Sequence, residues 1–137
     1  MSKYFDDKGN IRKELLEKQA EEDARSFLHP DGRDAALNSA QLRKFYGDFK
    51  ALEKKLASTA RGLSEDAAFL RILPLIKMMK SKVAYASNPK KTKIPGAFKQ
   101  WLNGHVDAIE TVNDFRAFLL HFEAVVGFCY GHGMSNS

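Results

Sequence analysis

The feature that most constrains this chain is its last long helical segment, which is apolar on nearly every side. The segment begins after Asn113 and reads "DFRAFLLHFEAVVGFC". Leu120 and Phe128 lie outside a face that already carries Phe115, Phe118, Leu119, Phe122, Val125, Val126 and Cys129. A helix that is hydrophobic almost all round is stable only where other helices surround it. The segment therefore predicts a helical bundle with this helix at its centre.

Four further helical segments are expected, at residues 10–28, 39–61, 65–86 and 96–109. The expected N-caps are Asn10 for the first of these segments, Asn38 or Ser39 for the second and Ser64 for the third. Asn113 is the expected cap of the last helix. Pro74 falls inside the third segment, so a kink or two short helices are expected there. No stretch alternates like a strand. The fold class predicted is all-α, a small single-domain bundle of about five to six helices.

The inward faces of these segments are expected to form one core in residues 37–131. Residues 1–36 form an N-terminal helix and loop with a loosely attached start, and residues 132–137 a disordered tail. The apolar-face residues predicted before the last helix are Leu42, Phe45, Tyr46, Phe49, Leu52, Leu56, Phe69, Ile72, Ile76, Met79, Val83, Phe98, Trp101, Leu102, Val106 and Ile109.

Length and composition place the chain among ordinary single globular domains. Its 137 residues are 44% hydrophobic and 28% charged. Cys129 is the one cysteine, which excludes an internal disulfide and a thiolate metal site and suits a reducing cytoplasm. No signal sequence and no apolar stretch of about 18–20 residues is present, so no membrane association is expected.

Positive charge is concentrated in the middle of the chain. The whole sequence has 22 Lys and Arg against 17 Asp and Glu, but the stretch from Arg43 to Lys99 has 14 against 4. A domain with so local an excess favours a polyanionic partner, most simply nucleic acid.

The basic residues of segment 39–61 are ordered as well as numerous. At about 100° per residue, Arg43, Lys50, Lys54 and Arg61 fall within roughly 40° of one another beside the apolar face. Such a row has two interpretations: a solvent-exposed side of the helix without a ligand, or a surface that contacts phosphates. Lys77, Lys80 and Lys82 follow in the next segment, and Lys90, Lys91 and Lys93 in the loop after it. For the nearby Tyr46 and Tyr85, a ring in the core with a hydroxyl in water is favoured over stacking on a base.

Catalytic and cofactor motifs are missing from the sequence. The four histidines, His29, His105, His121 and His132, form no His-x-x-x-His or Glu-x-x-His pair that a metal site would need. No nucleophile elbow and no glycine-rich phosphate loop is found. The sequence thus predicts a protein that is not an enzyme and has neither metal nor cofactor.

Three motifs resemble a known family. In this order, "LNSAQLRKFYGDFKAL", "KSKVAYAS" and "FRAFLLHFEAVVGF" are similar to the small subunit of the type III-A CRISPR effector, the Csm complex, over Leu37 to Phe128. Arg43 and Lys44 match the basic positions of the first motif and Lys82 that of the second. Lys90 stands where the family often has an Arg after the Ala-Tyr pair. The end of the last motif departs, with Gly127, Phe128 and Cys129 where the family usually has Ala-Tyr followed by a basic residue or His.

The resemblance implies a non-catalytic, all-helical RNA-binding subunit of a ribonucleoprotein. Its expected partners are the guide RNA, the target RNA, the backbone and large effector subunits, and further copies of itself. Together with the charge pattern, the RNA-binding residues expected are Arg43, Lys44, Lys50, Lys54, Arg61, Lys80, Lys82, Lys90 and Lys91. The alternatives are a DNA-binding domain, against which the acids opening segment 65–86 argue, and a protein-interaction module without an RNA role.

Overall fold

The computed structural model describes residues 2–88 and 93–136, which form six α-helices and one short 3-10 helix without a β-strand. The elements are η1 (Lys13–Leu16), α1 (Lys18–Leu28), α2 (Ser39–Thr59), α3 (Glu65–Lys77), α4 (Met79–Ala86), α5 (Gly96–Ala108) and α6 (Val112–Gly131). The all-α prediction is confirmed. Lys90 and Lys91 lie outside the described residues.

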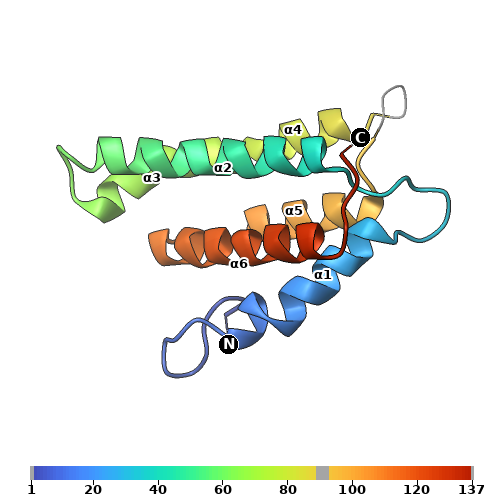
Figure 1. Ribbon diagram of the computed structural model, residues 1–137. Coiled ribbons are helices and arrows are strands. Elements are labelled where there is room, and N and C mark those ends of the chain that lie inside the picture. The colour runs from blue at the N-terminus through green and yellow to red at the C-terminus, as the bar shows by residue number, and fades with distance from the viewer. Residues whose placement is uncertain (1, 89–92, 137) are drawn as a thin grey trace.

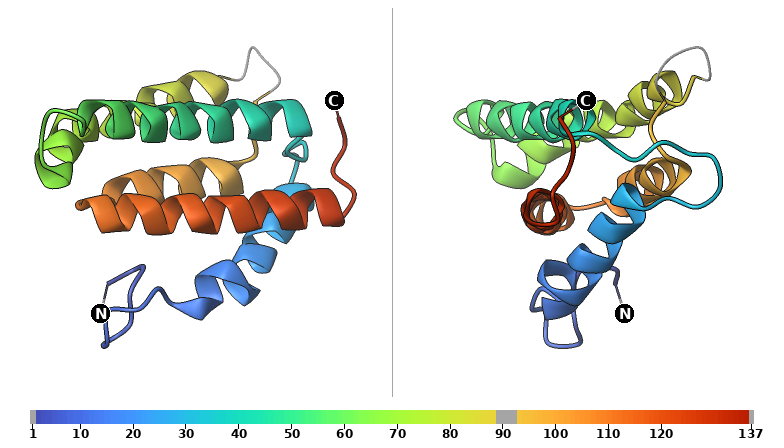
Figure 2. Two further views of the ribbon diagram at one scale, coloured as in Figure 1. Left: turned by 60° about the vertical axis from the view of Figure 1, so that its left-hand side comes forward. Right: turned by 45° about the vertical axis from the view of Figure 1, so that its right-hand side comes forward.

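The helices are stacked in three layers (Figures 1 and 2). Helices α2, α3 and α4 form one layer and α5 and α6 the next, while η1 and α1 cross the far side of α5 and α6. Helix α6 packs against α1, α2 and α3, and Phe115, Phe118 and Phe122 are fully buried. The prediction of a central last helix is therefore confirmed.

Aromatic rings hold the first two layers together. Phe49 of α2 lies edge-on to Phe118 and Phe122 of α6, with ring centroids 5.0 and 6.0 Å apart. Phe45 of α2 meets Phe98 of α5 in the same way at 5.7 Å. Edge-to-face pairs of this kind add about 0.5–1.5 kcal/mol each to the burial of the rings. The interface between these layers is thus apolar and closely packed.

Side chains fix where the helices begin. Asn38 caps α2, because its side chain accepts from the Gln41 backbone while the Gln41 side chain accepts from the Asn38 backbone. Ser64 caps α3 as expected. The expected cap of the last helix is wrong, because Thr111 and not Asn113 caps α6. The Thr111 side chain accepts from the Asp114 backbone, and the Asp114 side chain accepts from the Thr111 backbone.

The long third segment is divided at Met78. Pro74 lies inside α3, and the segment expected at 65–86 separates into α3 and α4 four residues beyond the proline, where the Met78 N–H still donates to the Pro74 carbonyl. All five residues predicted for its buried side, from Phe69 to Val83, are buried. The expectation of two short helices is confirmed, and the turn at Met78 brings α4 alongside α5.

The N-terminal segment, here residues 2–28, differs most from expectation. Asn10 does not cap a helix; its N–H donates to the Asp6 carboxylate in a turn, and α1 begins only at Lys18. The predicted loose start is also wrong, because Tyr4 is buried to 1% exposure. An antiparallel bridge between Phe5 and Ile11 closes the turn. The segment is anchored against α5 and α6 from its fourth residue onward.

The C-terminal residues also contact the bundle. The Ser135 carbonyl accepts from the Ser39 backbone, and the Ser39 hydroxyl donates to the Asn136 side chain, so residues 132–136 lie over the start of α2. Within residues 2–88 and 93–136, none of the helices combines the length and hydropathy that a bilayer crossing requires.

Candidate nucleic-acid interface

Helix α2 carries a group of exposed cations. Arg43, Lys44, Lys54 and Lys55 are all exposed, and within the described parts of the chain none of them is within ion-pair distance of an acid. Leu42, Phe45, Phe49 and Leu56 anchor the opposite side of the helix in the core. The amphipathic pattern thus holds these four cations in water on a helix that the bundle keeps in place.

The cations form two rows with small residues between them. At about 100° per residue, Arg43 and Lys54 lie within roughly 20° of each other, and Lys44 and Lys55 lie about 100–120° further round. Ala40, Gly47 and Ala51 are exposed in the angle between the rows. A Cβ added to Gly47 would meet nothing within 4 Å. A phosphodiester backbone can therefore approach the helix closely here, with cations on both sides. These residues form the α2 basic face: Arg43, Lys44, Lys54 and Lys55.

Two members of the expected row are placed differently. Lys50 is half-buried and pairs with Glu53 at 2.6 Å, a contact that raises the pKa of Lys50 chiefly through its hydrogen bond. Arg61 comes after α2 has ended at Thr59, so helical spacing no longer determines its direction, although its side chain is exposed. Lys55 was not expected from the sequence, yet it lies eleven residues after Lys44, a spacing that could have revealed the second row.

A groove of about 680 Å³ lies beside the α2 basic face, between α2 and α4. Lys44, Lys82 and Tyr85 are among its lining residues, and the Tyr85 ring is 56% exposed. Lys82 reaches across it to Asp48 at 3.3 Å. The structure therefore brings Lys44 and Lys82 of the expected set to one hollow. Tyr46 is instead half-buried and packs on Phe122 at 5.1 Å.

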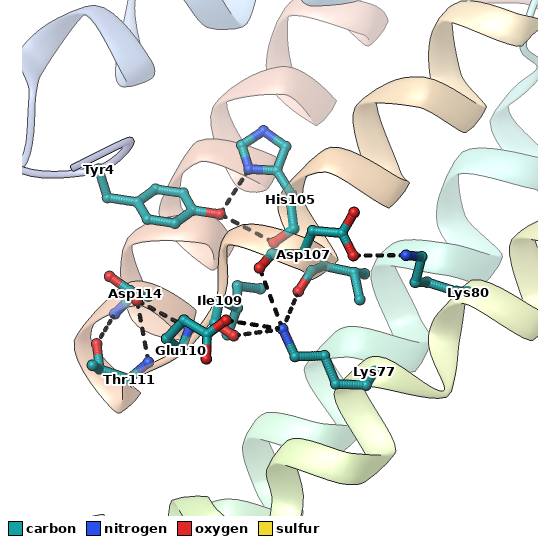
Figure 3. A network of polar contacts seen from close by, with 10 residues as sticks. Tyr4, Lys77, Lys80, His105, Asp107, Ile109, Glu110, Thr111 and Asp114 are labelled. Atoms are coloured by element: carbon teal, nitrogen blue, oxygen red, sulfur yellow. Dashed lines mark hydrogen bonds and ion pairs between the residues drawn. The ribbon is translucent and has the colours of Figure 1, made fainter.

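The remaining lysines of α3 and α4 make internal contacts (Figure 3). Lys80 donates to the Asp107 carboxylate at 2.6 Å, a hydrogen bond that lowers the pKa of Asp107. Lys77 donates to the carbonyl oxygens of Val106 and Ile109 at 2.6 and 2.8 Å, at the end of α5. Lys93 lies 3.9 Å from Asp34. Lys77 acts structurally, and Lys80 shares its charge with an acid of the same chain.

The titratable side chains inside the bundle are arranged for packing. Burial raises the pKa of the Cys129 thiol to about 12, which keeps it protonated. His105 and His121 are buried, and sequence reasoning missed both because the residues that contact them are far away in the chain. No group of three or more His, Cys, Asp or Glu side chains in the described part of the chain is arranged to hold a metal ion.

The fold and this surface define an all-helical single domain with a basic face on one long helix. A family model described as Csm2 Type III-A matches residues 10–133. The chain therefore belongs to that family, the small subunit of the type III-A CRISPR effector, and the resemblance of the three sequence motifs is confirmed. No curated protein and no solved structure matches it.

Proposed function

We propose that this subunit binds RNA phosphates through the α2 basic face and the adjoining groove, as a non-catalytic part of the type III-A complex. The guide RNA and the target RNA are its nucleic-acid partners. The backbone and large subunits, and further copies of this chain, are its protein partners in the cytoplasm. Family membership supports the setting, and the charge of the middle of the chain supports the ligand.

One observation carries the proposal: four exposed cations without an acidic partner among the described residues share one helix with small residues between them. Long side chains of this kind grip phosphate oxygens without reading bases, which gives sequence-tolerant and salt-dependent binding. Lys82 adds a fifth positive group across the groove once a phosphate competes with Asp48. Arg61 extends the positive surface past the end of α2.

A protein-interaction role has some support of its own. Leu70 of α3 and Met78, the residue between α3 and α4, are 64% and 56% exposed and are accessible to a partner protein. Met78 lines one hollow with Lys55 of the α2 basic face, so a protein contact at Met78 would adjoin the surface proposed for RNA, whereas Leu70 does not line that hollow. A DNA-reading role has less support, because Glu65 and Asp66 are exposed at the start of α3.

The test compares two triple variants that lose equal charge. Arg43→Ala/Lys44→Ala/Lys54→Ala changes the α2 basic face, and Lys8→Ala/Lys13→Ala/Lys18→Ala changes exposed lysines of the N-terminal segment. Anisotropy of labelled single-stranded RNA, measured over a salt series, gives both affinity and salt slope. The first variant should lose several-fold to several-tens-fold in affinity, and its log–log slope should shrink by up to about 2 units.

The control variant should stay close to the wild type, apart from a small general field effect. Equal weakening of the two variants would show that the protein is only generally basic. Wild-type binding that does not change between low and moderate salt would contradict phosphate contact altogether.

A further inference from the structure

The contact between the N-terminal segment and α5/α6 differs in chemistry from the rest of the core. Only three polar side chains are fully buried in the described residues, and two of them, His105 and His121, lie in this contact. Their rings are 5.0 Å apart. Among the described residues, the interface on the other side of α5 and α6 is built mainly from phenylalanine rings and contains no buried histidine contributed by α2, α3 or α4.

His105 is held by the first residues of the chain. The Tyr4 hydroxyl lies 2.8 Å from Nδ1 of His105, and the same hydroxyl is 3.5 Å from the His105 carbonyl (Figure 3). Tyr4 has its hydroxyl proton here, because burial raises the pKa of the phenol well above its ordinary value. Nδ1 of His105 can accept a hydrogen bond from this hydroxyl only while the imidazole is neutral, because both ring nitrogens of a charged imidazole are donors. Burial, with help from His121 and Lys3, lowers the pKa of His105 to about 2.

His121 joins two other parts of the N-terminal segment. Its Nδ1 lies 2.5 Å from the Leu15 carbonyl, which can only accept, so Nδ1 carries a proton. Its Nε2 is within 3.1 Å of the Trp101 N–H, a donor, and 3.2 Å of the Asp23 carboxylate, an acceptor. Both ring nitrogens of His121 are therefore engaged, with Leu15 and Asp23 of the N-terminal segment and with Trp101 of α5.

We propose that the N-terminal segment is a proton-sensitive latch, which undocks from α5 and α6 as a unit when the buried His105, held by Tyr4, takes up a proton while α2–α6 stay folded. Undocking places His105 in water, where it binds a proton readily, and gives up the Tyr4 contact. The cavity of about 230 Å³ beside His105, lined also by Lys3, Arg12 and Trp101, gives water a route to this histidine.

The surrounding charges set the direction of the effect. Lys3 of the N-terminal segment opposes a proton on His105, and Arg12 lines the same cavity. Asp23 of α1 contacts His121, and the charge of Asp114 of α6 acts on Tyr4. A histidine with an ordinary pKa of 6.5 when undocked and a much lower pKa when docked favours undocking below pH 6.5. From His105 alone, the undocking equilibrium should rise about thirty-fold between pH 8 and pH 5.

Two measurements on the full-length protein follow the latch directly. Trp101 is the single tryptophan and lies in the contact itself, so its emission should shift to longer wavelength as the pH falls to 5, with little change in far-ultraviolet circular dichroism. Hydrogen exchange, corrected for its intrinsic pH dependence, should show the α1 amides exchanging at least ten-fold faster than the slowest α2 amides.

Variants separate the titration of His105 from general acid sensitivity. Tyr4→Phe removes the hydroxyl but not the titration, so α1 should exchange faster at every pH with the same pH slope. His105→Gln keeps an acceptor for Tyr4 but cannot titrate, so the slope should flatten. His29→Gln, at an exposed histidine, should match the wild type.

Equal protection of α1 and α2 at every pH would overturn the proposal, because the segment would then open only with the whole molecule. Faster exchange of α1 with no pH dependence would overturn it as well, since His105 would not control the latch. If His105→Gln does not fold, His105→Asn provides the same test of the slope, because the asparagine amide also offers an acceptor and does not titrate.

Discussion

At the scale of single residues, the core depends most on Phe122 of α6. Its ring is fully buried and lies 4.9–6.0 Å, centroid to centroid, from the rings of Tyr46, Phe49, Trp101 and Phe118. It therefore joins α2, α5 and α6 at one point. A cavity left there would be surrounded by rigid rings that cannot easily close it.

We expect Phe122→Ala to lower the free energy of unfolding by about 3–5 kcal/mol, because both the burial of the ring and its contacts are lost. Urea denaturation followed by circular dichroism measures the change. Leu120→Ala on the same helix is the matched control, since Leu120 is 43% exposed and should cost much less. Similar losses for the two variants would mean that α6 is not the central helix.

At the scale of helices, Lys77 of α3 stabilises the end of α5. The last carbonyl groups of a helix have no partner within it, and Lys77 donates to two of them while Glu110 lies 3.8 Å away. The positive charge of Lys77 also interacts favourably with the negative end of the α5 dipole. One side chain thus joins the layer of α2–α4 to the layer of α5 and α6.

Lys77→Met should destabilise the protein by about 1–3 kcal/mol, because part-buried carbonyl groups lose their donor. Thermal unfolding of this variant is compared with that of Lys55→Met, an exposed α2 lysine without an acidic partner among the described residues. Lys55→Met should melt close to the wild type. A melting temperature that Lys77→Met leaves unchanged would contradict a structural role for this lysine.

How far the sequence predicts the helices depends on where their stabilising contacts lie. Helix α2 was predicted within two residues of its observed ends. Its capping residues and its apolar face lie within the segment itself, so both are visible in the local sequence. The start of the N-terminal segment was missed, because Tyr4 and Leu15 find their partners more than 100 residues away. For the candidate site, the sequence supplied Arg43, Lys44 and Lys54. The pairing of Lys50 with Glu53 has i,i+3 spacing and could have been predicted, whereas the pairing of Lys80 with Asp107 joins residues 27 positions apart and could not.

At the scale of the whole molecule, the α2 basic face adjoins an exposed apolar residue, because Lys55 and Met78 line one hollow, while Arg43, Lys44 and Lys54 are not part of its lining. We expect the variant Arg43→Ala/Lys44→Ala/Lys54→Ala to enter the type III-A complex as well as the wild type when all subunits are produced together. Its target RNA should be held several-fold less tightly. Native mass spectrometry gives the incorporation, and filter binding gives the RNA affinity. Loss of incorporation would identify α2 as a protein interface instead.

The packing of the N-terminal segment on α6 has a consequence for how the chain is made. Residues 2–28 leave the ribosomal exit tunnel before α5 and α6, and the partners of Tyr4 and Leu15 follow 101 and 106 residues later. Until α5 and α6 emerge, Tyr4, Leu15 and Phe27 therefore have no surface to bury against. The high charge of residues 1–36, with 7 basic and 9 acidic side chains, keeps this waiting segment soluble until α6 emerges.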